Sequence, residues 1–503
     1  MAFETPLSGS AAPIQISSAN YTLHAPGLKG RVKELNKEEQ TTRGGGAKDR
    51  NHQNWLNATD DAEAFLMKQF EIEVISDEHK NARDTATRSG GLNAQTDKGE
   101  AAMILSTPKT RGNMEQAILY TDENGESRWI WPDKTDETSF KFNIPREGAE
   151  IPQGEENRTR GEVTKGIRRT VKVFAWLIDP LVEMGTGFLV RKWEEKKRPY
   201  GFHYVEPNAF GANDIPWSDI NGNRALLLLH GTFSTGQAAY DGLIKSTWLE
   251  KLAGLYQGRI FAFNHPSLHH SPTENIREFI KMLPPDVRNL DLDIVTHSRG
   301  GLVGRELCER FDELNPTDKT LKVRRAILVA GPHNGTILTN KENWVKLIDS
   351  YTNMLTDLPD NPFTITMEAL ITFIKVVAAG ALKGLPGLQA MLPGGDYLTR
   401  LNTGQPTSTE YYSIGAKYVP QDENLLARFG KRLVMKALSH VFGEDSDMVV
   451  PTKGCFETDP MAAGFPIDPA RMKIFDLESD VNHLNYFEDK HPVNKQLFTW
   501  LSA

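Results

Sequence analysis

The segment Leu292–Val303, LDIVTHSRGGLV, limits the possible folds of this chain more than any other. An apolar run leads into His-Ser-Arg-Gly-Gly, after which apolar residues recur at helical spacing. A strand that turns sharply into a helix needs small residues two positions before and two positions after the turn residue. Thr296 and Gly300 occupy these positions around Ser298. The segment therefore predicts a strand–turn–helix unit that holds Ser298 in a strained conformation.

Other short apolar runs predict that this strand belongs to a mostly parallel sheet. Unbroken runs are typical of strands that are buried on both faces, and helical patterns separate most of them, as in doubly wound folds. The runs are Ala225–Leu229, Ile260–Phe263, Arg325–Ala330, Tyr411–Gly415 and Met472–Phe475. We therefore expect an α/β domain over residues 221–503.

Residues 61–147 have a period of two instead. Phe70, Ile72 and Val74 alternate with polar residues, and Asp122–Gly125 is a convincing hairpin turn between two short runs. This pattern predicts a smaller β-rich accessory module, for packing or for binding a protein partner.

The stretches on either side of this module are not expected to form domains of their own. Residues 1–60 are polar and read as irregular and flexible, with a Gly-rich charged part at 41–53. Residues 148–220 read as a linker followed by an amphipathic helix, since apolar residues between Thr170 and Glu194 recur at helical spacing, with a kink near Pro180. We expect this helix to pack on the next domain, with contact to a membrane surface as the alternative.

Composition excludes several classes of protein. The 503 residues are enough for about three domains of ordinary size. The 58 basic and 66 acidic residues leave a net charge of -8, which argues against a dedicated nucleic-acid-binding protein. The two cysteines, Cys308 and Cys455, exclude a disulfide scaffold and fit packed thiols in a reducing compartment. With no secretory signal pattern and no clean apolar run of about 20 residues, we expect a soluble, cytoplasmic protein.

A second loop fits the chemistry that a serine in such a turn can perform. A nucleophilic serine needs two backbone N–H groups directed at the oxyanion that develops on the substrate. The run Leu228–Ser234, LLHGTFS, ends a predicted strand about 70 residues before Ser298. The N–H groups of Thr232 and Arg299 are the candidates, whereas His230 is expected to hold the loop.

Nucleophilic catalysis also needs a base within reach of the serine and a carboxylate that orients the base. Both are expected after the serine, in the order Ser, Asp, His. Asp447 is the preferred acid and His483 the preferred base. The competing residues are Asp445 and Asp480 for the acid, and His440 and His491 for the base.

Four separated motifs, LLLLHGTFS, VTHSRGG, DSDMVVP and VNHLNYF, make the segment from about Ala225 to Trp500 resemble an α/β-hydrolase of the lipase/esterase group. The resemblance puts the nucleophile on Ser298, the acid on Asp447 and the histidine on His483. Thr296 departs from the usual glycine of the turn. The stretch Met391–Asn402 is also similar to one in bacterial lipases and phosphatidylcholine-acyltransferase-like enzymes. The resemblance covers just over half of the chain and says nothing about the first 220 residues.

The resemblance implies a serine hydrolase for carboxylic esters that uses no cofactor. A metal site at His265, His269 and His270 is not expected, because no cysteine or acidic cluster accompanies them. Two other interpretations stay open: an acyltransferase with the same triad, and an interaction protein that uses the hydrolase domain as a scaffold.

A long apolar insertion at about 340–400 suggests the substrate. Its apolar residues recur at helical spacing between glycines and prolines, which favours a cap over the cleft instead of one further core helix. A cap that buries acyl chains predicts a lipid or long-chain acyl ester substrate, with small soluble esters as the alternative, and transient contact with a membrane surface.

Overall fold

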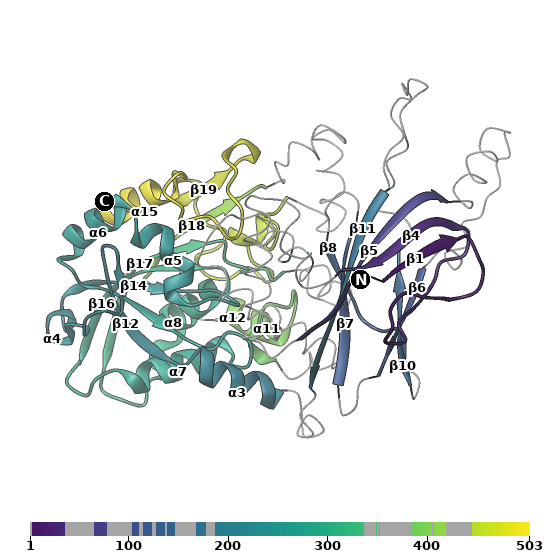
Figure 1. The fold of residues 1–503 in the computed structure, drawn as a ribbon. Helices are drawn as coiled ribbons and strands as arrows, with labels where there is room; N and C mark the ends of the chain where they lie inside the picture. Colours follow the sequence, from purple (N-terminus) through teal and green to yellow (C-terminus); the bar gives the residue numbers. More distant parts are fainter. Residues whose placement is uncertain are drawn as a thin grey trace. The chain divides into compact units, whose positions relative to one another are not determined.

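The computed structural model describes residues 3–35, 65–77, 103–109, 114–122, 127–135, 138–145, 167–177, 187–336, 349, 352, 385–404, 407–418 and 445–503. The chain divides into two units (Figure 1). The first comprises Met1–Leu181 with Tyr351–Ala379, and the second comprises Val182–Ser350 with Gly380–Ala503. The chain thus returns to the first unit within the segment that was predicted to be a cap.

The described part of the first unit contains two antiparallel sheets. The six-stranded sheet has the order β1 (Glu4–Ser8), β4 (Leu28–Glu34), β5 (Phe65–Asp77), β11 (Ile167–Leu177), β7 (Met114–Thr121) and β8 (Ser127–Ile130). The five-stranded sheet has the order β2 (Ile14–Gln15), β3 (Thr22–His24), β6 (Met103–Pro108), β10 (Ser139–Ile144) and β9 (Lys134–Thr135). Alternate residues of both sheets, such as Phe70 and Phe142, form one hydrophobic core. The β-rich prediction is confirmed.

Two expectations about the flanking stretches were wrong. Residues 1–60 contain β1 to β4, and the predicted helix that starts at Thr170 is in its first part the strand β11, which pairs with both β5 and β7. The register of β11 against β5 shifts between Val173 and Phe174, and Phe174, Ala175 and Trp176 are all buried. Before this shift, buried residues of β11 alternate with more exposed ones; after it, successive residues are all buried, which removes the alternation by which a strand is recognised. A helix does follow, as α3 (Gly187–Lys197).

An eight-stranded sheet forms the centre of the second unit. Its order is β13 (Ala209–Phe210), β12 (Gly201–Glu206), β15 (Ile260–Asn264), β14 (Arg224–Leu229), β16 (Asn289–His297), β17 (Thr320–Val329), β18 (Glu410–Ala416) and β19 (Met472–Phe475). Neighbours are parallel from β15 to β19, and β12 is antiparallel to both β13 and β15. Each apolar run in the sequence coincides with one of these strands, so the mostly parallel sheet is confirmed.

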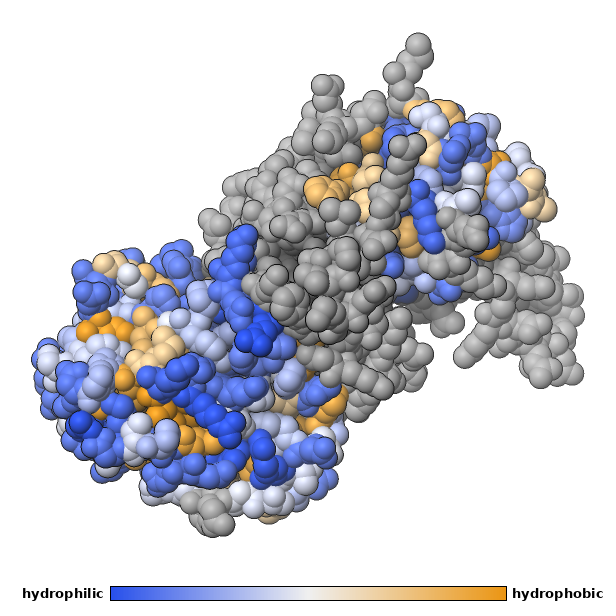
Figure 2. Space-filling view, turned by 90° about the horizontal axis from the view of Figure 1, so that it is seen from below, coloured by the Kyte–Doolittle hydropathy of each residue, from blue (hydrophilic) through white to orange (hydrophobic). Residues whose placement is uncertain are grey.

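Helices cover both faces of this sheet (Figure 1). One face packs against α5 (Gly236–Ile244), α6 (Thr247–Tyr256) and α15 (Val493–Ser502), and the other against α7 (Pro272–Met282) and α8 (Gly300–Leu314). Leu226 and Leu228 of β14 lie in the first core and Leu227 and Leu229 in the second. This explains why the strand is apolar from Ala225 to Leu229. Where Figure 2 shows the surface of this unit, hydrophilic residues dominate.

Shorter elements complete the second unit. They are the helices α4 (Trp217–Ile220), α11 (Pro386–Gln389) and α12 (Asp396–Asn402), and the 3-10 turns η3 (Lys453–Cys455), η4 (Pro469–Arg471) and η5 (Leu477–Ser479). Most of the predicted cap at 340–400 lies outside the described residues. Within the described part of the chain, no helix is both long enough and apolar enough to span a bilayer.

One described residue of the insertion belongs to the first unit. Thr352 is buried, and its Oγ1 accepts a hydrogen bond of 3.1 Å from Nε1 of Trp129 on β8. Thr352 therefore packs within the β-rich unit.

Candidate active site

Ser298 occupies the turn between β16 and α8. Its φ of 54° lies in the left-handed region, which is uncommon for a residue with a side chain and is found at strained functional sites. The turn is fixed by its backbone, since the Ser298 N–H donates to the Val329 carbonyl (2.9 Å) and its own carbonyl accepts from Gly301 (2.8 Å).

The turn is packed so closely that two of its neighbours must be glycine. A Cβ on Gly300 would lie 2.4 Å from the Leu229 carbonyl oxygen, and a Cβ on Gly231 would lie 2.6 Å from the Ser298 Cβ. These contacts press the start of α8 against the end of β14. The Thr232 loop and the serine turn therefore lie against each other.

His483 links Ser298 to Asp447. The Ser298 Oγ lies 2.9 Å from Nε2 of His483, and Nδ1 of His483 lies 2.8 Å from Oδ2 of Asp447. All three side chains are buried. If the Nδ1–H donates to the carboxylate, Nε2 is left as the acceptor for the serine hydroxyl, which is the tautomer that a general base needs.

The surroundings of Asp447 favour the ionised form of its carboxyl group. Its Oδ1 accepts from the N–H groups of Val449 (3.0 Å) and Val450 (2.8 Å), and the Tyr486 hydroxyl donates to Oδ2 (3.0 Å). Burial on its own would raise the pKa of Asp447, but the charge and hydrogen bond of His483 and the two N–H donors lower the pKa overall. The carboxylate therefore keeps its charge beside the imidazole.

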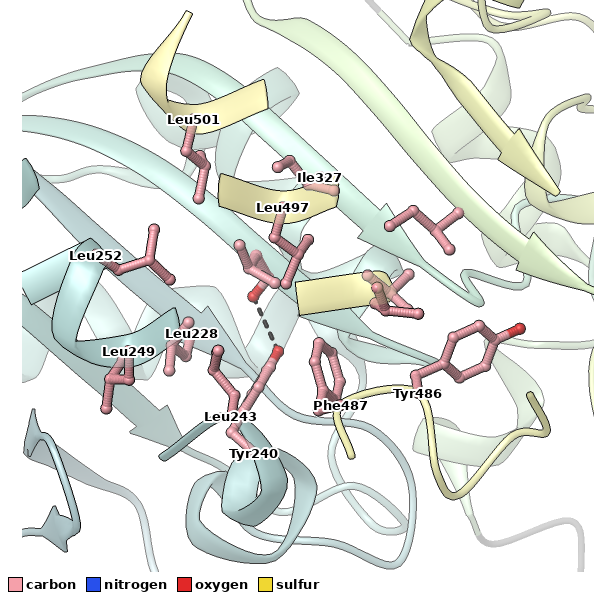
Figure 3. Close-up of a cluster of buried hydrophobic side chains, with 14 of the residues drawn as sticks. Leu228, Tyr240, Leu243, Leu249, Leu252, Ile327, Tyr486, Phe487, Leu497 and Leu501 are labelled. Carbon is pink, nitrogen blue, oxygen red and sulfur yellow. Dashed lines mark hydrogen bonds between the residues drawn. The ribbon is translucent and has the colours of Figure 1, made fainter. Parts of the chain in front are cut away.

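The side chains beyond His483 connect the site to the core. Tyr486 and Phe487 pack in the cluster shown in Figure 3, together with Tyr240, whose hydroxyl donates to the carbonyls of Leu229 (2.8 Å) and Val295 (2.9 Å). The same core thus supports the histidine loop and the ends of β14 and β16.

The competing residues have other partners. Asp445 is exposed and pairs with Lys417 (2.8 Å), and Asp480 lies 3.8 Å from Lys490 at the surface. His491 lies 3.9 Å from Glu488, and His440 lies outside the described residues. Among these candidates, the structure brings Asp447 and His483 to Ser298.

The two backbone donors named from the sequence border the serine. Thr232 follows Gly231 in the loop after β14, and Arg299 follows Ser298 at the start of α8. Neither N–H donates to an acceptor within the described residues.

Two buried histidines hold the backbone of the site. His230 accepts from the His265 N–H through Nε2 (3.1 Å) and lies with Nδ1 2.9 Å from the Gly231 carbonyl, so it connects the loops after β14 and β15 as expected. Nε2 of His297 lies 2.9 Å from the carbonyl of His483. Burial lowers the pKa of each to about 3, which keeps both rings neutral. A role for His297 was missed in the sequence, although it directly precedes Ser298.

Within the described residues, no three His, Cys, Asp or Glu side chains gather as a metal site would require. Nδ1 of His265 lies 3.1 Å from the Phe263 carbonyl. The rings of His269 and His270 lie edge to face at the surface of the loop after β15. The structure does not bring these three histidines together as one site.

A family model described as "Domain of unknown function (DUF7379)" matches residues 195–502. Among curated proteins, none matches the chain. The match to the family model spans more than half of the chain and includes every residue of the candidate site.

Several solved structures are similar to parts of the chain. Phospholipase PlaB from Legionella pneumophila is 15% identical, with a TM-score of 0.30, over 46% of this chain and 45% of that one. Lipase 1 from Pelosinus fermentans is 12% identical (TM-score 0.37; 56% and 98%), and carboxylesterase CesB from Bacillus subtilis is 13% identical (TM-score 0.31; 63% and 96%). The chain thus spans less than half the length of the Legionella protein.

Proposed function

The chain belongs to the family described as a domain of unknown function (DUF7379), and from its site we propose that it is a serine hydrolase that cleaves carboxylic esters. The observation that carries this proposal is the continuous chain of hydrogen bonds from Ser298 through His483 to Asp447. The left-handed turn at Ser298 supports it, because an ordinary buried serine needs no strained backbone.

In the proposed reaction, the Ser298 Oγ attacks the acyl carbonyl while Nε2 of His483 takes its proton. Asp447 stabilises the resulting imidazolium. The N–H groups of Thr232 and Arg299 donate to the tetrahedral oxyanion, which collapses as His483 gives its proton to the leaving alcohol. Water then attacks the acyl-enzyme with His483 again as the base, and the acid product leaves with Ser298 restored.

We further propose a lipid or long-chain acyl ester as the substrate. The support is the apolar insertion at about 340–400, because a pocket that takes an acyl chain must be largely apolar. The proposal includes transient contact with a membrane surface, a cytoplasmic location, and no cofactor, metal or nucleic acid. A protein partner for the β-rich unit is part of the same proposal.

Labelling with a fluorophosphonate probe, followed by a screen of ester and phospholipid substrates, tests the proposed function. The wild type should be labelled and should hydrolyse esters. Ser298→Ala should abolish both, since removing a triad nucleophile costs on the order of 10⁶ in turnover. Ser218→Ala is the control, because Ser218 is an exposed serine of the same unit.

Two results would redirect the proposal. Full labelling of Ser298→Ala would move the nucleophile to another residue. Transfer products that replace the free acid when an alcohol is added would identify an acyltransferase.

A further inference from the structure

Glu194 is a buried carboxylate on α3 that binds three consecutive backbone N–H groups. Its Oε1 accepts from Ser267 (2.6 Å) and Leu268 (2.8 Å), and its Oε2 accepts from His269 (2.7 Å). Burial raises the pKa of Glu194, while the three N–H donors act in the opposite direction and favour the carboxylate. One side chain thus fixes the backbone of the loop that follows β15.

This loop supports the first backbone donor of the site. The Phe233 N–H donates to the Ser267 Oγ (3.2 Å), and Phe233 has a left-handed φ of 58°. Phe233 directly follows Thr232, so this bond fixes the orientation of the chain next to the Thr232 N–H. A shift of Ser267 would therefore be passed to Thr232.

The same loop also holds the second donor residue. The Arg299 side chain is fully buried and donates to the carbonyls of His270 and Gly387 and to Oδ1 of Asn275. Its positive charge also attracts the Glu194 carboxylate. Residues 267–270 therefore connect to Thr232 at one end and to Arg299 at the other.

We propose that Glu194 is a positioning residue for the oxyanion: it holds residues 267–270, and through them the N–H groups of Thr232 and Arg299. This inference rests on the proposed function, since it concerns the reaction of Ser298 with an acyl group. Such donors act only when they are already in place as the charge develops, and loss of one costs about 10²–10³ in kcat. Because they bind the transition state more strongly than the substrate, their misplacement lowers kcat and leaves KM little changed.

The test compares Glu194→Gln with Glu195→Gln. Glutamine keeps the shape of Glu194 but places an amide –NH₂ where one oxygen accepted an N–H. Glu195 is the next residue of α3 but is exposed and paired with Arg191 (2.8 Å), which makes it a matched control. With a p-nitrophenyl ester that the wild type hydrolyses, Glu194→Gln should lower kcat by about 10-fold or more with KM unchanged, and Glu195→Gln should have no effect.

A thionoester separates positioning from general loss of structure. Its sulfur accepts hydrogen bonds weakly, so its hydrolysis depends less on the two N–H donors. Glu194→Gln should therefore slow the ordinary ester more than the thionoester, whereas partial unfolding would slow both equally. Ser267→Ala, which removes the acceptor of the Phe233 N–H, should give the same selective loss, and Ser267→Thr, which keeps the hydroxyl, should restore the ratio.

Each outcome has a defined meaning. An inactive, unlabelled wild type would overturn the proposed function and this inference with it. An active wild type in which Glu194→Gln keeps its kcat, or loses both ester rates in equal proportion, would overturn the inference alone. If Glu194→Gln does not fold, the Ser267 pair decides by the same criterion.

Discussion

Nε2 of His297 lies 2.9 Å from the backbone carbonyl of His483, and the two imidazole rings are 5.0 Å apart. The residue before the proposed nucleophile thereby binds the main chain of the proposed base. Since burial keeps His297 neutral, it can donate this hydrogen bond without bringing a second positive charge to the imidazole of His483.

The first prediction follows from this bond. His297→Leu removes the donor and should lower kcat by about 10- to 100-fold, because a base that moves by about 1 Å loses rate on that scale. His297→Gln carries an N–H donor at a similar reach and should stay within about threefold of the wild type. Steady-state kinetics check both variants. Equal kcat values for the two would contradict a role for this hydrogen bond in catalysis.

The second prediction concerns the acid. Asp447→Asn should lower turnover by about 10⁴, because the amide no longer holds His483 in the required tautomer. Asp445→Asn, which changes a nearby exposed carboxylate, should leave turnover nearly unchanged. The reverse ranking would assign the acid to Asp445.

The third prediction concerns the contact between the two loops. Gly231→Ala places a methyl group 2.6 Å from the Ser298 Cβ, so one of the two backbones must shift. Probe labelling should slow by at least about 10²-fold, as expected when a nucleophile and its oxyanion donors are displaced. Gly254→Ala is the control, since a Cβ there has no neighbour within 4 Å. Normal labelling of Gly231→Ala would contradict the close approach.

The fourth prediction concerns stability and pH. The pKa values of His230 and His297 are about 3 in the folded chain, lowered first by burial, and an unfolded histidine has a pKa of about 6.5. Between these values the unfolded chain binds more protons, so acid destabilises the fold. At about pH 5, each histidine should remove about 2 kcal/mol of the stability that is present near neutral pH.

Urea unfolding at about pH 7.5 and about pH 5 checks this prediction. The midpoint should fall on acidification, and it should fall less in His297→Gln, which has one fewer buried histidine. An equal fall in both proteins would show that His297 does not titrate as its burial requires.

The fifth prediction concerns the acyl chain. In a series of p-nitrophenyl esters, kcat/KM should rise from acetate to octanoate, because a longer chain buries more apolar surface. The double variant Leu370→Asp/Ile374→Asp, in the apolar insertion, should lose this preference. Equal cleavage of acetate and octanoate by both proteins would reject a long-chain substrate.

The sequence predicts the second unit better than the first for a physical reason. Strands such as β14 are buried on both faces, so each contains an unbroken apolar run that is easily recognised in the sequence. Short antiparallel strands such as β2 and β3 lack such a signal, and the bulge at Val173 disguises β11.

The residues of the candidate site also differ in how well the sequence predicts them. Ser298, Asp447 and His483 lie in local motifs and could be selected from the sequence. Glu194 acts on residues more than 70 positions away, and nothing near it in the chain indicates that its carboxylate is buried. Long-range contacts of this kind depend on the assembled fold.

The family model and the structural units divide the chain at different places. The family model spans residues 195–502, yet residues 351–379 within it belong to the unit that begins at Met1. No single cleavage of the chain could release the two units intact, and a fragment from residue 182 onward would lose the bond between Trp129 and Thr352. The boundaries of the family match therefore differ from those of the second unit.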